Sequence, residues 1–312
     1  MNQKIKIQSP KKCIVCGNAA IHVFRIQYSK PDYAVVQCLR CGFLFIPSVF
    51  RQQINFTQYK SSETAREVAK ADLWIKRQRN LLRYRLIRKL HPSGRLLDIG
   101  CGFGHFLLTG REMGYRVHGI EMSRNNAEFI RGQFGIPVVE GDFLRIPLKT
   151  EYDVVTLWDT LEHMDRADLV LEKVSRVLKP GGAVYIQVPQ SDSFFARLLR
   201  DRWWAVGLDH VNYFSGTTIR LLLRRYGLDV IGIRSSIEMK NILLYVLLPR
   251  VKGKRGPSTA WSAAERQKAF NRITRKPMWI RKCLVLVHNA AYRTLSFLRI
   301  GDEMVVVAVK KG

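Results

Sequence analysis

The chain has 312 residues, of which 47% are hydrophobic, and a formal net charge of +27. This length is enough for one full α/β domain and an accessory module. No apolar run reaches the roughly 18 residues that a membrane-spanning helix needs, and the first residues lack the apolar core of a secretion signal. We therefore expect a cytoplasmic protein. The positive charge is compatible with nucleic acid, an anionic membrane or an acidic substrate as partner, and it does not distinguish among them.

Four of the six cysteines form two CxxC pairs near the start of the chain, in CIVCG and CLRCG. The glycine after each pair allows a tight turn that presents two thiolates to one ion. In a reducing cytosol such pairs indicate metal ligands before disulfides, and four sulfurs complete a closed tetrahedral zinc site. We predict a zinc ribbon over residues 1–50, with two short strands in IHVFRI and YAVVQC. Its structural Zn²⁺ would be held by Cys13, Cys16, Cys38 and Cys41.

A helical linker is predicted over residues 51–92, with one long helix over 61–90. No glycine or proline interrupts this helix, its apolar residues recur at helical spacing, and Pro92 and Gly94 follow its end. Its arginines are expected on a solvated face, with a phosphate-facing role as the alternative. These are Arg77, Arg79, Arg83, Arg85 and Arg88.

The stretch RLLDIGCGFGHFLL, residues 95–108, places three glycines between two apolar runs. The first run predicts a buried strand with Asp98 near its end, and the second opens a helix. Glycine permits unusual φ values and a close approach of a ligand to the backbone. The spacing GxGxG with His105 argues against NAD or FAD, because their GxGxxG/A fingerprint needs a small residue there. A P-loop is excluded because no GK[ST] follows.

Further strands are predicted after this loop. One strand is predicted over residues 115–120, with Glu121 at its end. A carboxylate there can accept hydrogen bonds from both hydroxyls of a ribose. The next ends at Asp142, which is suited to accept from an exocyclic amine, and Phe143, which can lie against an adenine. EYDVVTLWDTLEHM is a fourth strand that opens into a loop, and VSRVLKPGGAVYIQVP is a helix, a turn and a fifth strand.

This ordered series resembles the class I S-adenosylmethionine-dependent methyltransferases over about residues 93–235. The resemblance is carried by LLDIGCGFG, Glu121, GDF, EYDVV with LEH, and LKPGG. It implies an α/β fold with a Rossmann-like seven-stranded sheet, in which the last strand, within 301–312, inserts antiparallel. With the ribbon in front, the chain is similar to bacterial small-molecule methyltransferases, including sugar C-methyltransferases that carry such a ribbon.

The resemblance also implies S-adenosylmethionine as the cofactor. The three glycines would approach its methionine part, Asp98 would hold the loop and the ammonium side, and Glu121 would hold the ribose. The full set of expected cofactor-binding residues is Asp98, Gly100, Gly102, Gly104, Glu121, Met122, Asp142, Phe143 and Trp158.

Methyl transfer needs an aligned acceptor and often the removal of one proton from it. WDTLEHM offers His163 as a base with a suitable titration range, the alternative being a structural histidine beside the cofactor pocket. WWAVGLDHVNYFS, residues 203–215, offers His210 with Asp209 as an orienting carboxylate, and aromatic side chains to wall an acceptor pocket. The alternative for His210 is to cap the helix that starts near Thr217.

Residues 236–300 are predicted to form a basic, apolar helical insertion before the last strand. Apolar helices flanked by cations suit contact of residues 240–300 with an anionic membrane, here its inner face. A helical lid, a dimer contact and a nucleic-acid surface are the alternatives, and the oligomeric state stays open.

We predict methyl transfer from S-adenosylmethionine to a small-molecule acceptor such as a sugar, a glycolipid or a lipid-like compound. One alternative is an RNA methyltransferase, because a type of enzyme for guanine in ribosomal RNA also joins a four-cysteine zinc site to this fold. The other is a non-catalytic scaffold that binds the cofactor.

Overall fold

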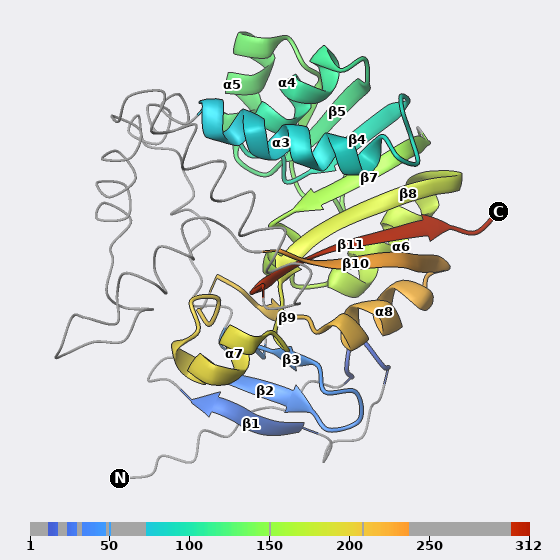
Figure 1. The fold of residues 1–312 in the computed structure, drawn as a ribbon. Helices are drawn as coiled ribbons and strands as arrows, with labels where there is room; N and C mark the ends of the chain where they lie inside the picture. Colours follow the sequence, from blue (N-terminus) through green and yellow to red (C-terminus); the bar gives the residue numbers. More distant parts are fainter. Residues whose placement is uncertain are drawn as a thin grey trace, which may run out of the picture.

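The computed structural model describes residues 12–17, 24–29, 33–47, 50, 73–149, 151–207, 209–236 and 301–312. They form a seven-stranded sheet with helices on both faces and a four-stranded sheet beside it (Figure 1). The first part of the predicted linker helix and the basic insertion, with its predicted membrane contact, lie outside the described residues. Within the described part of the chain, no helix is both long enough and apolar enough to cross a bilayer.

The large sheet has the strand order β10-β11-β8-β7-β4-β5-β6. Neighbours from β6 to β8 are parallel, whereas β11 is antiparallel to both β8 and β10. The predicted α/β sheet of seven strands and the antiparallel insertion of its last strand are therefore confirmed. The strands are β4 (Arg95–Ile99), β5 (Arg116–Glu121), β6 (Val138–Glu140), β7 (Tyr152–Trp158), β8 (Leu178–Pro189), β10 (Leu228–Ser236) and β11 (Glu303–Lys310).

Alternate side chains of the central strands enter two different hydrophobic layers. Leu96 and Val154 lie in the layer that includes α3 (Leu73–Ile87), α4 (His105–Glu112) and α5 (Arg124–Phe134). Leu97 and Val155 lie in the layer that includes α6 (Ala167–Val177) and α8 (Gly216–Arg224). Burial on both faces explains why these strands read as continuous apolar runs. The parallel strands all end at one edge, where ligands of such sheets bind.

The end of β6 and the start of β8 differ from the sequence prediction. β6 ends at Glu140, so Asp142 and Phe143 lie in the loop that follows it. β8 already begins at Leu178, before the predicted Pro-Gly-Gly turn. Leu178 pairs with Tyr152 and Ala183 pairs with Val154, so the turn bulges out of a continuing strand instead of preceding it.

The small sheet joins the cysteine-containing segment to the core of the protein. β1 (Phe24–Ser29), β2 (Ala34–Cys38) and β3 (Leu44–Phe45) are successive antiparallel strands, and β9 (Asn212–Tyr213) pairs with β3. Arg225, next to the end of α8, donates from Nη1 to the carbonyl oxygens of Ile14 and Val15 at 2.6 and 2.8 Å. The predicted ribbon strands are thus present, and a strand from the core completes their sheet.

The contact between α3 and α4 yields a prediction about stability. A Cβ on Gly110 of α4 would lie 2.0 Å from the hydroxyl of Tyr84, which is fully buried and donates to the Phe106 carbonyl at 3.1 Å. We expect Gly110→Ala to lower the free energy of unfolding by about 1–3 kcal/mol, because the added methyl overpacks this layer. Urea unfolding would measure the change.

Gly132→Ala is the matched control. Gly132 lies within α5, and a Cβ there would meet nothing within 4 Å. This substitution should leave stability unchanged or raise it by up to ~1 kcal/mol, because alanine favours a helix over glycine. Equal effects of the two substitutions would contradict the contact between α3 and α4.

Candidate cofactor and acceptor site

The turn between β4 and α4 has three glycines with positive φ, namely 74° at Gly100, 55° at Gly102 and 73° at Gly104. A Cβ on Gly100 would lie 2.6 Å from Thr160, and one on Gly104 would lie 2.7 Å from Ile130. A Cβ on Gly102 would meet nothing within 4 Å. Packing therefore requires two of the glycines, whereas the third borders open space that a ligand can enter.

Glu121, at the end of β5, holds the glycine turn in place. Its Oε2 accepts a hydrogen bond from the Gly102 N–H at 2.7 Å, and its Oε1 accepts one from the Ser123 N–H at 2.8 Å. Burial raises the pKa of this carboxyl, and the two backbone N–H groups partly oppose that rise. The residue predicted to bind a ribose thus also sets the backbone around Gly102.

Asp98 lies beneath the same turn and is 3% exposed. Its Oδ1 accepts a hydrogen bond from the Thr156 hydroxyl at 2.6 Å. Burial raises the pKa of Asp98 to about 7, against the lowering effects of Thr156 and of the Arg83 guanidinium. A cationic ligand group near Asp98 would favour the ionised carboxylate.

Three further residues that were predicted to bind the cofactor, of which Asp142 and Phe143 were expected at the adenine, differ in exposure. Met122 is 72% exposed, and the partly exposed Asp142 accepts at Oδ1 from the Leu144 N–H at 2.9 Å. Phe143 differs from the prediction, because its ring is 2% exposed and lies in the hydrophobic core. The loop after β6 turns this side chain inward, so Phe143 is a core residue and not an open face for an adenine.

Trp158, at the end of β7, is also more buried than predicted. It is 8% exposed, with the Arg83 guanidinium carbon 4.2 Å from its ring centroid and the Phe106 ring 5.5 Å away. The ring that was expected to lie over the cofactor is thus covered by α3 and α4.

The two segments predicted to face the acceptor lie together. The Val211 N–H donates to the Glu162 carbonyl at 2.9 Å, and Asn212 Nδ2 donates to the Met164 carbonyl at 2.7 Å. These bonds fasten the segment before β9 along the short 3-10 helix η2 (Leu161–His163). The ring centroids of His163 and His210 are 4.7 Å apart. The two histidines therefore belong to one site.

Hydrogen bonds to carbonyl groups set the tautomer of both histidines. His163 Nδ1 lies 2.6 Å from the Asp209 carbonyl oxygen, and His210 Nδ1 lies 2.8 Å from the Ala205 carbonyl oxygen. A carbonyl oxygen only accepts, so each Nδ1 carries the proton and each Nε2 presents a lone pair. Burial lowers the pKa of His210 to about 4, so this imidazole is neutral at pH 7.

Two expectations for His210 are corrected. The Asp209 carboxylate lies 4.0 Å from His210 Nε2 and is half exposed, so the Ala205 carbonyl orients the ring instead. The N-terminus of α8 is capped by Ser215, whose side chain accepts from the Thr218 N–H at 3.1 Å. His210 therefore does not cap that helix.

A buried polar network that sequence reasoning missed borders the ends of β7, β8 and β11. Gln187 donates from Nε2 to Asp159 Oδ1 and to Glu303 Oε2, both at 2.9 Å, and accepts at Oε1 from Arg83 Nη2 at 3.0 Å. Arg83 is 8% exposed, so its placement on a solvated face was wrong; its guanidinium turns inward toward these groups. The available signal was the glutamine inside the apolar run VYIQVP.

The Sγ atoms of the four cysteines of the predicted ribbon all lie within 4.8 Å of one another. Cys13 and Cys41 have their Sγ atoms 3.8 Å apart, and those of Cys16 and Cys38 are 3.7 Å apart. These separations exceed the roughly 2.05 Å of a disulfide. Sulfurs placed about 2.3 Å from a tetrahedral Zn²⁺ would be about 3.8 Å from one another. The four thiols thus fit a single zinc ion.

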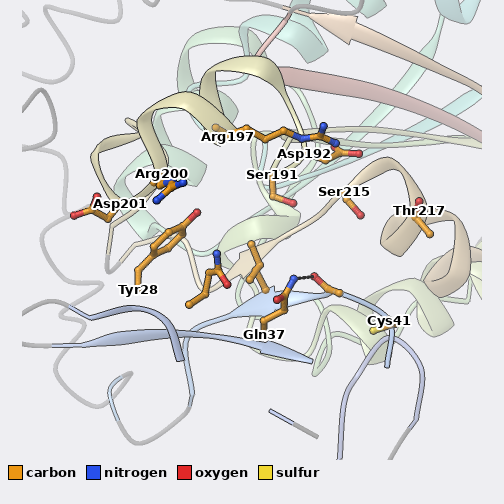
Figure 2. Close-up of a pocket in the computed structure, with 14 residues that line it drawn as sticks. Tyr28, Gln37, Cys41, Ser191, Asp192, Arg197, Arg200, Asp201, Ser215 and Thr217 are labelled. Carbon is orange, nitrogen blue, oxygen red and sulfur yellow. Dashed lines mark hydrogen bonds between the residues drawn. The ribbon is translucent and has the colours of Figure 1, made fainter. Parts of the chain in front are cut away.

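A cavity of about 960 Å³ lies between the four-stranded sheet and α7 (Phe194–Leu199). Figure 2 shows the residues that line it. Its charged lining residues are two arginines and two aspartates, and none of the predicted cofactor-binding residues lines it. The cavity is therefore distinct from the glycine turn. Its labelled polar residues include Tyr28, Gln37, Ser191, Asp192, Arg197, Arg200, Asp201, Ser215 and Thr217.

The open space beside Gly102 yields a prediction about ligand binding. We expect Gly102→Ala to fold, with strain of about 1–2 kcal/mol from its positive φ, and to bind S-adenosylmethionine at least roughly tenfold more weakly in calorimetry, or about 1.4 kcal/mol. Gly181→Ala is the control, because Gly181 also has a positive φ of 76° and its Cβ would meet nothing within 4 Å. An equal loss of binding in both variants would contradict this placement of the ligand.

The raised pKa of Asp98 predicts a pH dependence. Because a cationic ligand favours the carboxylate, binding of S-adenosylmethionine should release about one proton at pH 6 and nearly none at pH 8.5. Calorimetry in buffers of different ionisation enthalpy would count the protons, and Asp98→Asn should abolish the release. In the free protein, the raised pKa of Asp98 lowers stability as the pH rises. Because this pKa is about 7 in the folded state and lower in the unfolded chain, the contribution of Asp98 to the free energy of unfolding falls between about pH 4 and pH 7.

Comparison with known proteins places this geometry in a family. Residues 73–233, about half of the chain, match the family model described as methyltransferase domain. The sterol 4-C-methyltransferase strm-1 of Caenorhabditis elegans is 33% identical over 102 residues, covering 30% of this chain and 30% of that protein. The malonyl-[acyl-carrier protein] O-methyltransferase of Serratia marcescens is 27% identical over 167 residues, covering 52% of this chain and 64% of that protein.

Among solved structures, the phosphoethanolamine N-methyltransferase 2 of Haemonchus contortus in complex with S-adenosylmethionine has a similar fold. The TM-score is 0.50 at 15% identity, with 83% of this chain and 60% of that chain covered. The chain thus spans less than two thirds of the length of each of these three proteins. With the family match and the seven-stranded sheet together, the chain belongs to the methyltransferase domain family and contains a class I S-adenosylmethionine-dependent methyltransferase domain.

Proposed function

We propose that this enzyme methylates a small-molecule acceptor, of the sugar, glycolipid or lipid-like class, that enters beside His163 and His210. The contact between Gly100 and Thr160 carries the proposal, because no Cβ fits between them. It brings the loop after β7, with η2 at its end, directly against the turn that borders the cofactor space. The acceptor must reach the methyl group at this edge of the sheet.

The chemistry at this edge is a displacement at carbon. A bond forms between the acceptor atom and the methyl carbon, the bond from that carbon to sulfur breaks, and its electron pair stays on sulfur. The acceptor's proton must leave when the nucleophile is protonated. The Nε2 lone pairs of His163 and His210 lie at this place, with the half-exposed Asp209 carboxylate beside them.

The acceptor class is inferred from the relatives and from the sequence. The relatives are named for methylation at carbon in a sterol, at oxygen in a malonyl carrier protein and at nitrogen in phosphoethanolamine. These names support a small or carrier-bound acceptor and differ in the atom that receives the methyl group. Similarity to sugar C-methyltransferases that carry such a ribbon supports a sugar, whereas the net charge of +27 supports the RNA alternative.

Zinc has a structural role in this proposal. The spacing of the four Sγ atoms supports a bound Zn²⁺, and all four coordination positions would be filled by sulfur. The ion would fix the loops around β3, and β3 pairs with β9 directly after the segment that carries His210. Zinc would thus stabilise the acceptor side of the site without taking part in the reaction.

The test separates cofactor binding from transfer. We expect His163→Ala to bind S-adenosylmethionine like the wild type and to lose about 100-fold or more in methyl transfer, in the range typical of a lost acid–base group. Transfer of tritiated methyl to nucleotide sugars, membrane lipid extract and ribosomal RNA would be compared. His118→Ala is the control, because His118 contacts Tyr152 away from η2.

Each result of this comparison has a definite meaning. Label in sugars or lipids that falls in His163→Ala supports the proposal, whereas label in RNA alone would establish the RNA alternative. S-adenosylmethionine binding without transfer to any of the three pools would favour the non-catalytic scaffold.

A further inference from the structure

Three side chains with metal-binding atoms converge at the acceptor side of the site. Glu162, His163 and His210 each offer one ligand atom, and these atoms all lie within 4.8 Å of one another. They come from two segments that are far apart in sequence, namely η2 and the segment before β9. The Val211 N–H bond to the Glu162 carbonyl holds these segments together.

The three groups are all oriented as acceptors. Both Nδ1 atoms donate to backbone carbonyls, so both Nε2 atoms present lone pairs. His163 Nε2 lies 4.0 Å from Glu162 Oε1, which is too long for a hydrogen bond. Two ligand atoms about 2.1 Å from a tetrahedral ion are about 3.4 Å apart, so a small movement of these side chains would bring both atoms onto one ion. Glu162 is 2% exposed, and a nearby cation would offset the free energy that burial of a carboxylate costs.

The carbonyl partners are a second, independent sign. Histidines that bind metals almost always donate their other ring N–H to a carbonyl, a carboxylate or water, which fixes the ring and the tautomer. Both histidines here have this arrangement, to Asp209 and to Ala205. Packing alone does not require both Nδ1 atoms to donate to carbonyl oxygens. It also does not require each Nε2 atom to face a carboxylate.

We propose that Glu162, His163 and His210 bind a divalent first-row transition metal, through one carboxylate oxygen and two Nε2 atoms. Two imidazoles and a carboxylate suit Mn²⁺, Fe²⁺, Co²⁺ or Zn²⁺, whereas the four-cysteine site selects softer ions. Three protein ligands leave further positions open for water or an acceptor atom. The site differs in residues and in chemistry from the ribbon cysteines.

The metal also defines the acceptor, a step that rests on the proposed function. The Gly100–Thr160 contact puts η2 beside the cofactor turn, so an acceptor that reaches the methyl group would pass beside the three proposed ligands. A metal there lowers the pKa of a bound hydroxyl. The oxygen forms the bond to the methyl carbon, sulfur keeps the electron pair of the broken bond, and the hydroxyl proton passes to bulk water. The acceptor is therefore a hydroxyl compound, and loss of either histidine would remove a ligand of the metal that acidifies this hydroxyl.

The test uses Mn²⁺ on the full chain after its cysteine site has been filled with one equivalent of zinc and weakly bound zinc has been removed with a mild chelator, because Zn²⁺ would otherwise compete for the proposed site. We expect one Mn²⁺ per chain, measured by loss of the free-ion electron paramagnetic resonance signal, and nitrogen couplings from imidazole in pulsed spectra of the bound ion. His163→Ala and Glu162→Gln should each weaken Mn²⁺ binding by about tenfold or more. His118→Ala should bind Mn²⁺ like the wild type.

The proposal is overturned if the wild type binds no Mn²⁺, if the bound ion shows no nitrogen coupling, or if His163→Ala binds Mn²⁺ unchanged. The His163 side chain is 28% exposed, so this variant keeps the test valid even if the buried Glu162→Gln variant does not fold. S-adenosylmethionine binding is measured on the same samples. Intact binding without Mn²⁺ refutes only the metal site, whereas loss of S-adenosylmethionine binding in the wild type refutes the proposed function.

Discussion

The contact between Gly100 and Thr160 is the constraint on which the site depends. These residues belong to loops that leave adjacent parallel strands, β4 and β7, and the space between them has no room for even one methyl group. The loop after β4 shapes the cofactor space, and the loop after β7 leads into η2. Because the two loops are in direct contact, the position of one determines the position of the other.

A buried amide ties the same edge of the sheet to the rest of the core. Gln187 hydrogen-bonds to Asp159, Glu303 and Arg83, which come from the loop after β7, from β11 and from α3. Asp159 also has a φ of 55°, which is uncommon for a residue other than glycine. Such conformations persist where surrounding contacts over-determine them and are frequent at functional sites. The network thus joins the start of the loop after β7 to β8, β11 and α3.

Most of the sheet was predictable from sequence because its strands are buried on both faces and read as apolar runs that end in glycine or acidic residues. The pairing of β9 with β3 was not predictable, because a strand of two residues is too short to show a periodic pattern of apolar residues. Arg83 was misplaced because it lies next to Tyr84 at the border of the helix's buried face, and sequence does not show which way a long side chain turns. The prediction that Phe143 lies open to an adenine missed its burial for a similar reason, because an aromatic residue in a loop can face either the core or a ligand.

The site residues show the same division. The positive φ values of the glycine turn and the position of Glu121 follow from local chemistry, and the structure has them as expected. The meeting of His163 with His210 depends on contacts between distant segments. The sequence offered the two histidines only as separate candidates.

The mixed sheet of ribbon and core strands also limits how the chain can be divided. β9 contributes two residues whose backbone groups are satisfied by β3, and β3 belongs to the cysteine segment. A shortened chain without that segment would expose an unpaired strand edge, which is a template for association between molecules. The domain that matches the family model therefore shares a sheet with the cysteine segment, and a fragment cut between the two would separate β9 from its partner strand.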